Sequence, residues 1–265
     1  MTKVIGIVSL KGGVGKTSIV SGLGAALAGF GKKVLLIDAN LSAPNLGMHL
    51  NIINPTIGLH HVLARRVKPS EAVYKLDYFD IIPTRLFDRT IVDPLKLKDR
   101  IKLLKKRYDI VLLDSSPALN DETLAVLLAA DEILVVTTPD HPTLSITLKA
   151  IKLARQRGTP IQGLILNKVY KRNFELSIDD IEDVAEVPVM AVIPHDINML
   201  KALFEFTPST IHKPRSEGSE ELKKLAATIL GEKYDPFGFR WFFRRISPQK
   251  QDINRTIFYE RIFEE

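Results

Sequence analysis

Short apolar runs alternate along the chain with longer segments in which apolar residues recur every three or four positions. The runs are rich in Val, Ile and Leu and show no polar alternation, which is typical of strands buried on both faces. They predict strands at residues 4–8, 34–37, 79–82, 108–114, 132–137, 161–166 and 189–193. The periodic segments predict helices from about residue 17 to the glycines at 29 and 31, and at 58–63, 70–73, 94–107, 122–129, 142–157, 178–184, 198–204 and 220–229.

Strands and helices therefore alternate along most of the chain. This order predicts an α/β fold: a doubly wound, mostly parallel sheet with helices on both faces. The composition changes at Gly231, so we assign one domain to residues 1–231 and treat residues 232–265 as a separate tail.

The composition narrows the class of protein. None of the 265 residues is Cys, which excludes disulfides, zinc–thiolate sites and iron–sulfur ligation by the chain. The first strand begins too early for a signal peptide, and no apolar run approaches the ~20 residues of a membrane span, so we expect a cytoplasmic protein. The net charge of +6 suits an acidic partner, either nucleic acid or an anionic membrane surface. We interpret the basic residues of segment 94–107 as a solvated helix face in preference to a nucleic-acid patch.

The clearest chemistry lies between the first strand and the first helix, where the sequence reads S-L-K-G-G-V-G-K-T. A glycine-rich turn in this setting is typical of a phosphate-binding P-loop, because glycines let successive N–H groups converge on a phosphate. The helix N-terminus adds its positive end. Lys16 adds a charge for the β- and γ-phosphates, and Thr17 offers a hydroxyl to Mg²⁺. The predicted nucleotide-binding residues of this loop are Gly12, Gly13, Val14, Gly15, Lys16, Thr17 and Ser18.

The loop departs from the pattern G-x-x-x-x-G-K-[ST], because its first position is Leu10 and a second lysine, Lys11, follows. This K-G-G-x-G-K-T form resembles the deviant Walker A motif of the MinD/ParA family of dimerising P-loop ATPases, which have the SIMIBI-type fold. The resemblance covers roughly residues 1–230 and is closest to the MinD-like branch. It implies ATP and Mg²⁺ as ligands and an ATP-dependent homodimer, in which Lys11 would reach the nucleotide of the partner subunit.

Two aspartates follow strands that we expect to be neighbours in the sheet. Asp38 follows the strand at 34–37, and Asp114 ends the strand at 108–114. In a doubly wound sheet, ligands bind at the carboxyl ends of the strands. We therefore predict that Thr17, Asp38 and Asp114 hold Mg²⁺, with Asp114 in the Walker B role. The alternative for Asp114 is an N-cap of the next helix.

Residues 38–50 read D-A-N-L-S-A-P-N-L-G-M-H-L and resemble the first switch segment of the family, which generally begins D-x-D. The second aspartate of that motif helps to position the attacking water, and this chain has Asn40 in its place. An amide can hydrogen-bond a water but carries no negative charge to polarise it. We therefore predict slow ATP hydrolysis with binding and dimerisation intact. The predicted catalytic set is Lys11, Lys16, Asp38 and Asn40.

Three residues are candidates for contacts with adenine and ribose. Asn167 follows the strand at 161–166, and its amide can both donate to and accept from a base edge. Residues 187–196, V-P-V-M-A-V-I-P-H-D, also resemble the family and would place Pro194 and Asp196 beside the adenine. A turn asparagine and an Asx cap are the structural alternatives.

The tail combines aromatic and basic side chains. On a helix its apolar residues would share one face and its arginines would lie away from that face, which suits the interface of an anionic bilayer. MinD-like proteins carry a short amphipathic helix of this type near the C-terminus. Alternating aromatic residues equally allow a strand, and docking on the protein's own body or on a second subunit is the competing role. The residues concerned are Phe239, Arg240, Phe242, Phe243, Arg244, Arg245 and Ile246.

These patterns together predict a MinD-like ATPase, a dimerising switch that positions a division, motility or envelope complex with an unidentified protein partner or activator. Such a protein would be cytoplasmic or peripheral at the inner face of the cell membrane. One alternative is a ParA-like partition ATPase that binds DNA nonspecifically, with strong salt dependence. The other is a non-hydrolysing ATP-bound scaffold, which Asn40 permits.

Overall fold

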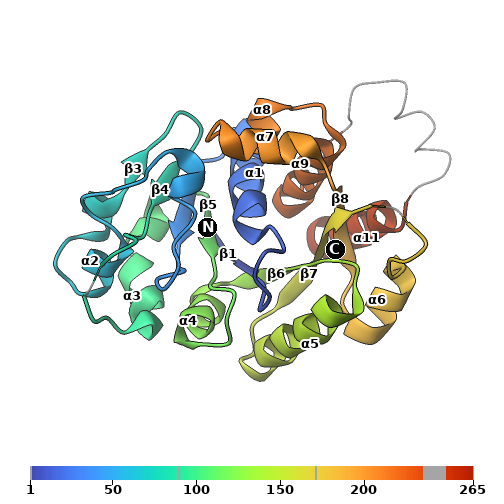
Figure 1. Ribbon diagram of the computed structural model, residues 1–265, viewed down its shortest axis with the longest axis horizontal. Helices are drawn as coiled ribbons and strands as arrows, with labels where there is room; N and C mark the ends of the chain where they lie inside the picture. Colours follow the sequence, from blue (N-terminus) through green and yellow to red (C-terminus); the bar gives the residue numbers. More distant parts are fainter. Residues whose placement is uncertain (1, 89, 171, 235–248, 265) are drawn as a thin grey trace.

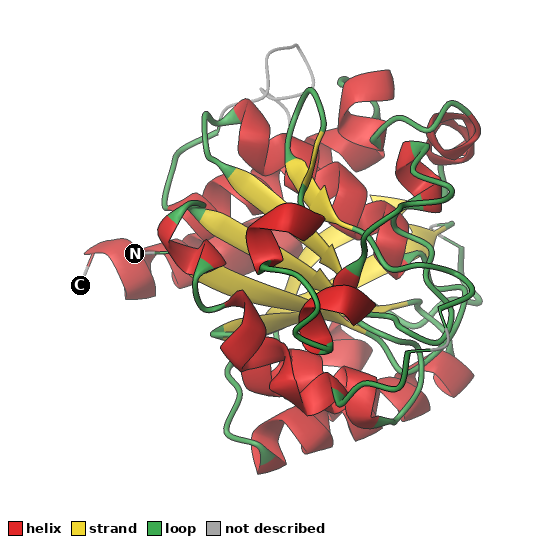
Figure 2. Ribbon diagram, turned by 90° about the vertical axis from the view of Figure 1, so that its left-hand side faces the viewer, coloured by secondary structure: helices red, strands yellow, loops and turns green. Residues whose placement is uncertain are grey.

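A twisted sheet runs through the middle of the molecule, with helices packed on both of its faces (Figures 1 and 2). The computed structural model describes residues 2–88, 90–170, 172–234 and 249–264. In this part of the chain the sheet has eight strands in the order β3-β4-β2-β5-β1-β6-β7-β8, all parallel except β3, which is antiparallel to β4. The prediction of a doubly wound, mostly parallel α/β fold is confirmed. The strands are β1 (Lys3–Val8), β2 (Val34–Asp38), β3 (Tyr74–Lys75), β4 (Asp80–Ile82), β5 (Ile110–Asp114), β6 (Glu132–Thr137), β7 (Ile161–Val169) and β8 (Val189–Pro194).

The helices divide between the two faces according to the hydrophobic cluster that each one joins. One face carries α1 (Lys16–Gly29), α7 (Ile197–Phe204), α8 (Ser209–His212) and α9 (Glu217–Leu230). The other carries α2 (Leu59–Leu63), α3 (Leu97–Ile101), α4 (Asp121–Ala129), α5 (His141–Gln156) and α6 (Ile178–Ala185). Further short turns of helix are η1 (Met48–Leu50), η2 (Pro69–Ala72), η3 (Pro94–Lys96), η4 (Leu104–Lys106) and η5 (Glu260–Glu264), and the C-terminal helix is α11 (Lys250–Tyr259).

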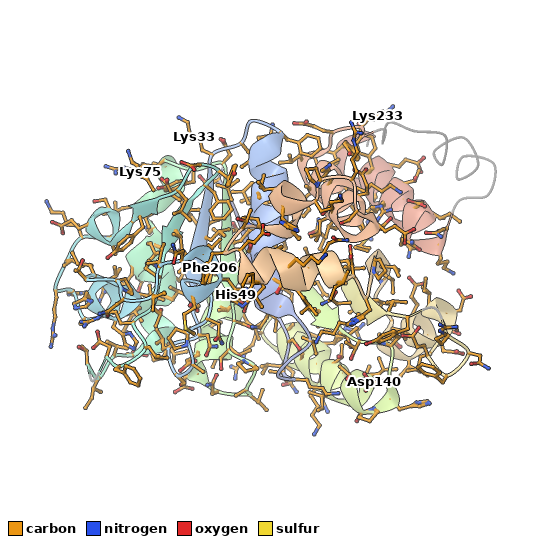
Figure 3. All side chains as sticks on the ribbon, turned by 45° about the horizontal axis from the view of Figure 1, so that its top comes forward. Lys33, His49, Lys75, Asp140, Phe206 and Lys233 are labelled. Atoms are coloured by element: carbon orange, nitrogen blue, oxygen red, sulfur yellow. The ribbon has the colours of Figure 1, made fainter. Side chains whose placement is uncertain are left out.

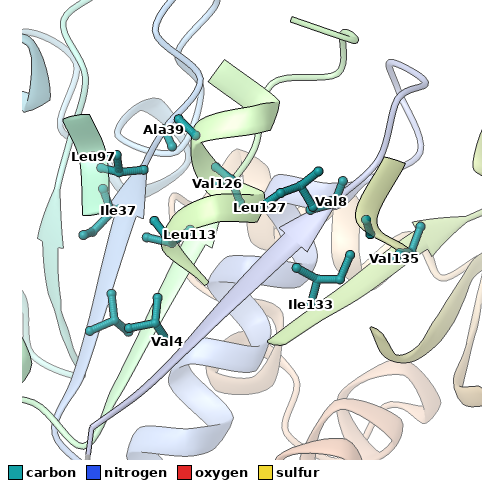
Figure 4. Close-up of a cluster of buried hydrophobic side chains, with 14 of the residues drawn as sticks. Val4, Val8, Ile37, Ala39, Leu97, Leu113, Val126, Leu127, Ile133 and Val135 are labelled. Carbon is teal, nitrogen blue, oxygen red and sulfur yellow. The ribbon is translucent and has the colours of Figure 1, made fainter. Parts of the chain in front are cut away.

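The central strand β1 shows why its apolar run lacks polar alternation. Val4 and Val8 point into the cluster beneath α4 (Figure 4). Ile5 and Ile7 belong to the opposite cluster, beneath α1. All four side chains are fully buried, because successive residues of a strand face opposite sides of the sheet and helices cover both sides. Gly6 lies under α4, where a β-carbon would come within 2.9 Å of a Val126 methyl group.

The strand order brings three loops together at the carboxyl edge of the sheet. β5 lies between β1 and β2, so the segments that follow these three strands share one edge. The register pairs Asp38 on β2 directly with Asp114 on β5. This edge is where doubly wound folds bind ligands, and it carries the predicted nucleotide site.

The basic segment at 94–107 is not the single helix that its periodicity predicts. It forms η3, α3 and η4 in succession, and Leu97, Ile101 and Leu104 are its buried residues. Leu103, another apolar residue of the segment, has 70% of its surface exposed. The three buried side chains join the same hydrophobic cluster as α4, so packing fixes the segment although its helix is interrupted.

The C-terminal helix α11 covers the edge strand β8. The Asn254 amide donates to the carbonyl of Val189 (2.8 Å), and the Arg255 guanidinium donates to the carbonyl of Met190 (2.7 Å). An uncovered edge strand exposes unpaired backbone groups, so this helix closes that side of the sheet. The predicted membrane or docking residues, 239–246, lie outside the described residues. Among the described residues, no helix has the length and apolarity needed to cross a membrane.

Candidate nucleotide-binding site

The loop between β1 and α1 has the open backbone that its glycines predict. Gly13 and Gly15 adopt φ angles of 78° and 89°, in the left-handed region that favours glycine. A β-carbon on Gly12 or Gly13 would meet nothing within 4 Å, so the loop is open on that side. A β-carbon on Gly15 would lie 2.3 Å from the Asn167 amide nitrogen, which leaves no room for a side chain.

The first turn of α1 is prepared for an anion. Its N-cap is Gly15, no side chain of the described residues caps it, and its first turn contains no acidic residue. The free N–H groups and the helix dipole therefore point at the loop without a protein partner. Ser18 lies half-buried in this turn, and Val14 anchors the loop with 3% of its surface exposed. The loop therefore has room for a phosphate, and the N–H groups at the start of α1 can donate hydrogen bonds to it.

Lys16, Thr17 and Asp114 form one hydrogen-bonded group at the edge of β5. The Lys16 ammonium lies 3.0 Å from Asp114 Oδ1, and the Thr17 hydroxyl donates to Asp114 Oδ2 at 2.7 Å. Lys16 and Asp114 have only 7% and 1% of their side-chain surface exposed. Sequence reasoning predicted that these three residues share a site, and the fold brings them into contact across 97 and 98 positions of sequence.

Asp38 is fully buried beside this group. Its carboxylate accepts hydrogen bonds from the backbone N–H groups of Asn40 (3.2 Å), Asn45 (3.1 Å) and Leu46 (3.0 Å). Burial, and next the charge of Asp114, raise the pKa of Asp38 to about 8, while those N–H groups and Lys16 oppose the rise. Two buried carboxylates thus face one lysine.

This surplus of negative charge fits a divalent cation. Carboxylate and hydroxyl oxygens are the ligands that Mg²⁺ prefers, and Asp38, Asp114 and Thr17 supply them. The described residues contain no cluster of three or more His, Asp or Glu side chains arranged for a metal. A Mg²⁺ ion at this edge would therefore complete its coordination with water and phosphate oxygens, as it does in phosphoryl-transfer sites.

Asn40 holds its own loop closed. Its side-chain oxygen accepts from the backbone N–H of Ala43 (3.2 Å), and its amide group donates to the carbonyl of the same residue. The side chain is 4% exposed. In this conformation both polar atoms of Asn40 act on the loop.

Asn167 lies inside β7, which extends three residues beyond the predicted end to Val169. Its amide nitrogen donates to the carbonyl of Val14 at 2.7 Å, which ties the strand to the P-loop. Its side-chain oxygen is buried and has no hydrogen-bond partner among the described residues. A buried acceptor without a partner is costly, and the exocyclic amino group of adenine is a donor of the required kind.

Comparison with known proteins places the chain in a family. Residues 2–157 match the AAA_31 family, which is described as an AAA domain. An uncharacterized ATP-binding protein of Methanocaldococcus jannaschii is 34% identical over 89% of this chain and 90% of its own length. The cell division ATPase MinD of Pyrococcus furiosus has 34% identity and a TM-score of 0.82, with 87% of this chain and 99% of that chain covered. The septum site-determining protein MinD of Pyrococcus horikoshii, solved in complex with Mg-ADP, has the same identity and TM-score over 86% of this chain and 96% of that chain.

The chain belongs to the MinD/ParA family of P-loop ATPases. Its resemblance in the motif Lys11–Thr17 is therefore a family relationship, and its fold is the fold of MinD. The comparisons do not assign roles to single residues, so the roles given to the site residues remain predictions.

The lysine that distinguishes this MinD/ParA loop, Lys11, is held at the start of α5. Its ammonium lies 3.4 Å from Asp140 Oδ1 and also donates to the Thr143 hydroxyl. Asp140 is the N-cap of α5 and accepts from the Thr143 N–H at 2.9 Å. Figure 3 shows Asp140, at the start of α5, far from Lys33. Burial raises the pKa of Asp140, but hydrogen bonds from Thr138 and Thr143 prevail and lower it to about 2.

Two members of the adenine region have structural partners. Asp196 is the N-cap of α7 and accepts from the Asn198 N–H at 2.8 Å, as the Asx-cap alternative predicts. Pro194 ends β8. The following residue, His195, stacks on Tyr170 with ring centroids 4.5 Å apart, at the carboxyl ends of β8 and β7. Whether Pro194 and Asp196 also touch a base stays a prediction.

Sequence reasoning missed two residues that shape this MinD/ParA site. Lys168 donates from its ammonium to the carbonyl of Gly13 at 2.6 Å, and its backbone adopts a φ of 58°. Asp140 holds Lys11, although the pattern Asp-His-Pro-Thr could have indicated a helix N-terminus at this position. No local pattern indicates the contact of Lys168, because it joins residues 155 positions apart.

Proposed function

We propose that this chain is a MinD-like switch that binds ATP and Mg²⁺, dimerises in the ATP-bound state and hydrolyses ATP slowly. The observation that carries the proposal is the buried, undercompensated group of Asp38, Asp114 and Lys16 at the mouth of an open P-loop. Such a group requires a cation, and the loop requires an anion. Mg²⁺ with the phosphates of ATP satisfies both.

The roles of the side chains follow from their positions. Lys16 exchanges its contact with Asp114 for the β- and γ-phosphates, and Asp114 then becomes available to Mg²⁺ or to its bound water together with Thr17 and Asp38. Bound Mg²⁺ supplies charge neutralisation for the phosphates. Asn167 presents its unpaired oxygen to the base. Nucleotide and Mg²⁺ thus give each of these residues a partner suited to its charge.

Lys11 is the residue available for a second subunit. Its contact with Asp140 joins side chains that are 36% and 44% exposed, and a surface ion pair of this kind contributes only about 0–1 kcal/mol. Lys11 can therefore leave Asp140 at little cost in free energy and contact a phosphate of the nucleotide bound to a partner subunit. This contact would join the two subunits of an ATP-bound dimer.

The amide at position 40 supports slow turnover. Asn40 is engaged with Ala43 and offers no negative charge to an attacking water. A long-lived ATP dimer would suit a protein that positions a division, motility or envelope complex and awaits an activating partner. Hydrolysis at rates typical of the family, unchanged by Asn40→Ala, would contradict slow turnover.

The dimer can be tested directly. Size-exclusion chromatography with light scattering should show a monomer with ADP and a dimer with a non-hydrolysable ATP analogue. Lys11→Ala should abolish the analogue-induced dimer while the analogue still binds, and Lys98→Ala, which removes an exposed lysine of α3, should not. A Lys11→Ala protein that still dimerises would contradict the proposed role of Lys11.

The target surface also needs a test, because both an anionic membrane and DNA suit the net charge of +6. Removing the whole tail would uncover β8, so the sharper variant replaces Phe239, Phe242 and Phe243 with Ser and keeps α11. ATP-dependent sedimentation with anionic liposomes that is lost in this variant supports membrane recruitment. Salt-sensitive plasmid binding that the variant retains supports the partition alternative instead.

A further inference from the structure

Glu122 is a buried carboxylate that the roles assigned above do not use. It is the second residue of α4, the helix that follows Asp114 and β5, and 7% of its surface is exposed. One carboxylate oxygen, Oε1, accepts a hydrogen bond from the Ser42 hydroxyl. The other, Oε2, is buried without a hydrogen-bond partner among the described residues. An unpaired buried carboxylate oxygen is costly, so its retention calls for a partner in some state of the protein.

The contact with Ser42 places Glu122 against the switch segment. Ser42 lies two residues after Asn40, in the loop that follows β2, and α4 follows the neighbouring strand β5. Both loops stand at the carboxyl edge that carries Lys16 and Asp114. Glu122 is therefore a negative charge from a second element that reaches the same loop as Asn40.

A second unpaired atom lies near this carboxylate. His60, on α2, is 5% exposed, and its Nδ1 has no partner among the described residues. Burial lowers the pKa of His60, and the charges of Asp88 and Glu122 oppose that change, which indicates that these groups are near one another. A buried polar atom without a hydrogen-bond partner in the protein is typical of a position where a water is bound.

We propose that the slow hydrolysis of this chain depends on Glu122, which supplies from a second element the carboxylate that position 40 lacks, with Oε2 accepting a hydrogen bond from the attacking water. This inference rests on the proposed ATPase function. In the reaction the water oxygen bonds to the γ-phosphorus, and the bond from that phosphorus to the β,γ-bridging oxygen breaks with its electron pair left on ADP. The water loses one proton, which Glu122 accepts and passes to the phosphate product. Asn40 keeps the loop in shape, and Ser42 orients the carboxylate.

The test compares Glu122→Gln with a matched control, Asp121→Asn, which removes an exposed carboxylate one residue earlier in the same turn. Glutamine keeps an oxygen for Ser42 but loses the charge. We expect Glu122→Gln to lower kcat roughly 100-fold or more, within the range of general-base removal, and to leave affinity for a non-hydrolysable ATP analogue within about twofold of the wild type. Asp121→Asn should leave both unchanged.

Rescue separates this role from a structural one. Asn40→Asp in the Glu122→Gln background should restore hydrolysis at least to the wild-type rate, because the charge returns on the same loop. An unaltered kcat in Glu122→Gln, or a failure of Asn40→Asp to rescue it, overturns the proposal. The proposal is also overturned if the wild type binds the analogue without hydrolysing ATP and the Asn40→Asp variant hydrolyses it. If the wild type does not bind the analogue at all, the proposed function itself fails, and this inference fails with it.

Discussion

Two clusters of buried charged side chains in the described part of the chain differ in how their charges are paired. At the nucleotide site, the carboxylates of Asp38 and Asp114 share one buried cation, Lys16. Between α11 and α9, two carboxylates of the described residues meet two cations. Arg255 contacts Glu221 at 3.0 Å and also contacts Asp252, and Lys224 lies 3.1 Å from Asp252 and 3.5 Å from Glu221.

The difference separates a site that holds structure from a site that awaits a ligand. Among the described residues, the α11 cluster pairs two carboxylates with two cations, and its guanidinium also binds the carbonyl of Met190. The nucleotide site has a surplus of negative charge, a raised pKa at Asp38 and an unpaired oxygen on Asn167. Imbalance in a buried cluster therefore indicates function here, and balance indicates anchoring.

The largest expected effect comes from breaking the balanced cluster. Arg255→Ala removes a charged partner from two carboxylates, those of the buried Glu221 and of Asp252, and removal of one member of a buried ion pair costs about 3–5 kcal/mol. Urea unfolding should show this loss, while Arg261→Ala, which removes an exposed arginine near the C-terminus, should change stability by less than about 0.5 kcal/mol. A loss below about 1 kcal/mol for Arg255→Ala would show that α11 contributes little to the fold.

The next effect concerns the unbalanced site. Lys16→Ala removes the cation that we assign to the phosphates, and a hydrogen bond to a charged group contributes about 1.5–3 kcal/mol, so ATP affinity should fall roughly 10- to 100-fold. Isothermal titration calorimetry measures this change. Lys33→Ala, at an exposed lysine near the opposite edge of the sheet, is the control. Equal ATP affinity in the wild type and in Lys16→Ala would show that Lys16 does not bind the phosphates.

Asp38→Asn should separate stability from ligand binding. The substitution removes one of two adjacent buried carboxyl groups but also one backbone hydrogen bond, so the free energy of unfolding should change by no more than about 1 kcal/mol. The dependence of ATP affinity on Mg²⁺ should fall, because a neutral amide binds Mg²⁺ less well than a carboxylate. A loss of stability as large as that of Arg255→Ala would show that Asp38 stabilises the fold, as the α11 cluster does.

The smallest effects are opposite pH dependences of the two regions. The pKa of Asp38 is raised to about 8, so its contribution to stability is full below the ordinary aspartate pKa and is lost as the pH rises through about 8. For Asp252, burial raises the pKa but Arg255 and Lys224 prevail and lower it. Its contribution is therefore present above the ordinary pKa and lost as the pH falls through the lower, folded value.

Urea midpoints measured without nucleotide from pH 3 to pH 9 would reveal both dependences. Asp38→Asn should flatten the profile on the side near pH 8, and Asp252→Asn should flatten it below about pH 4. A profile that neither substitution alters would mean that these two carboxylates titrate alike in the folded and unfolded chains.

Sequence reasoning reached the parts of the site that are contiguous in the chain. The glycines, Lys16 and Thr17 lie within one turn, so a P-loop could be predicted from local backbone requirements alone. Asp38 and Asp114 could be predicted as a pair because each ends an apolar strand, and the alternation of elements makes such ends converge. The prediction for segment 94–107 was wrong in detail, because periodicity indicates which residues are apolar but not how much sheet they can cover.

The sequence by itself determined the alternating fold, the P-loop, the family and the absence of cysteine chemistry. The tertiary structure alone decided that Lys168 and Asn167 clamp the P-loop, that Asp140 holds Lys11, that Glu122 reaches the switch segment, and that α11 closes β8. The physical reason is sequence distance. Each of these contacts joins residues 65 to 155 positions apart, and their meeting depends on strand order and side-chain burial, which no local pattern specifies.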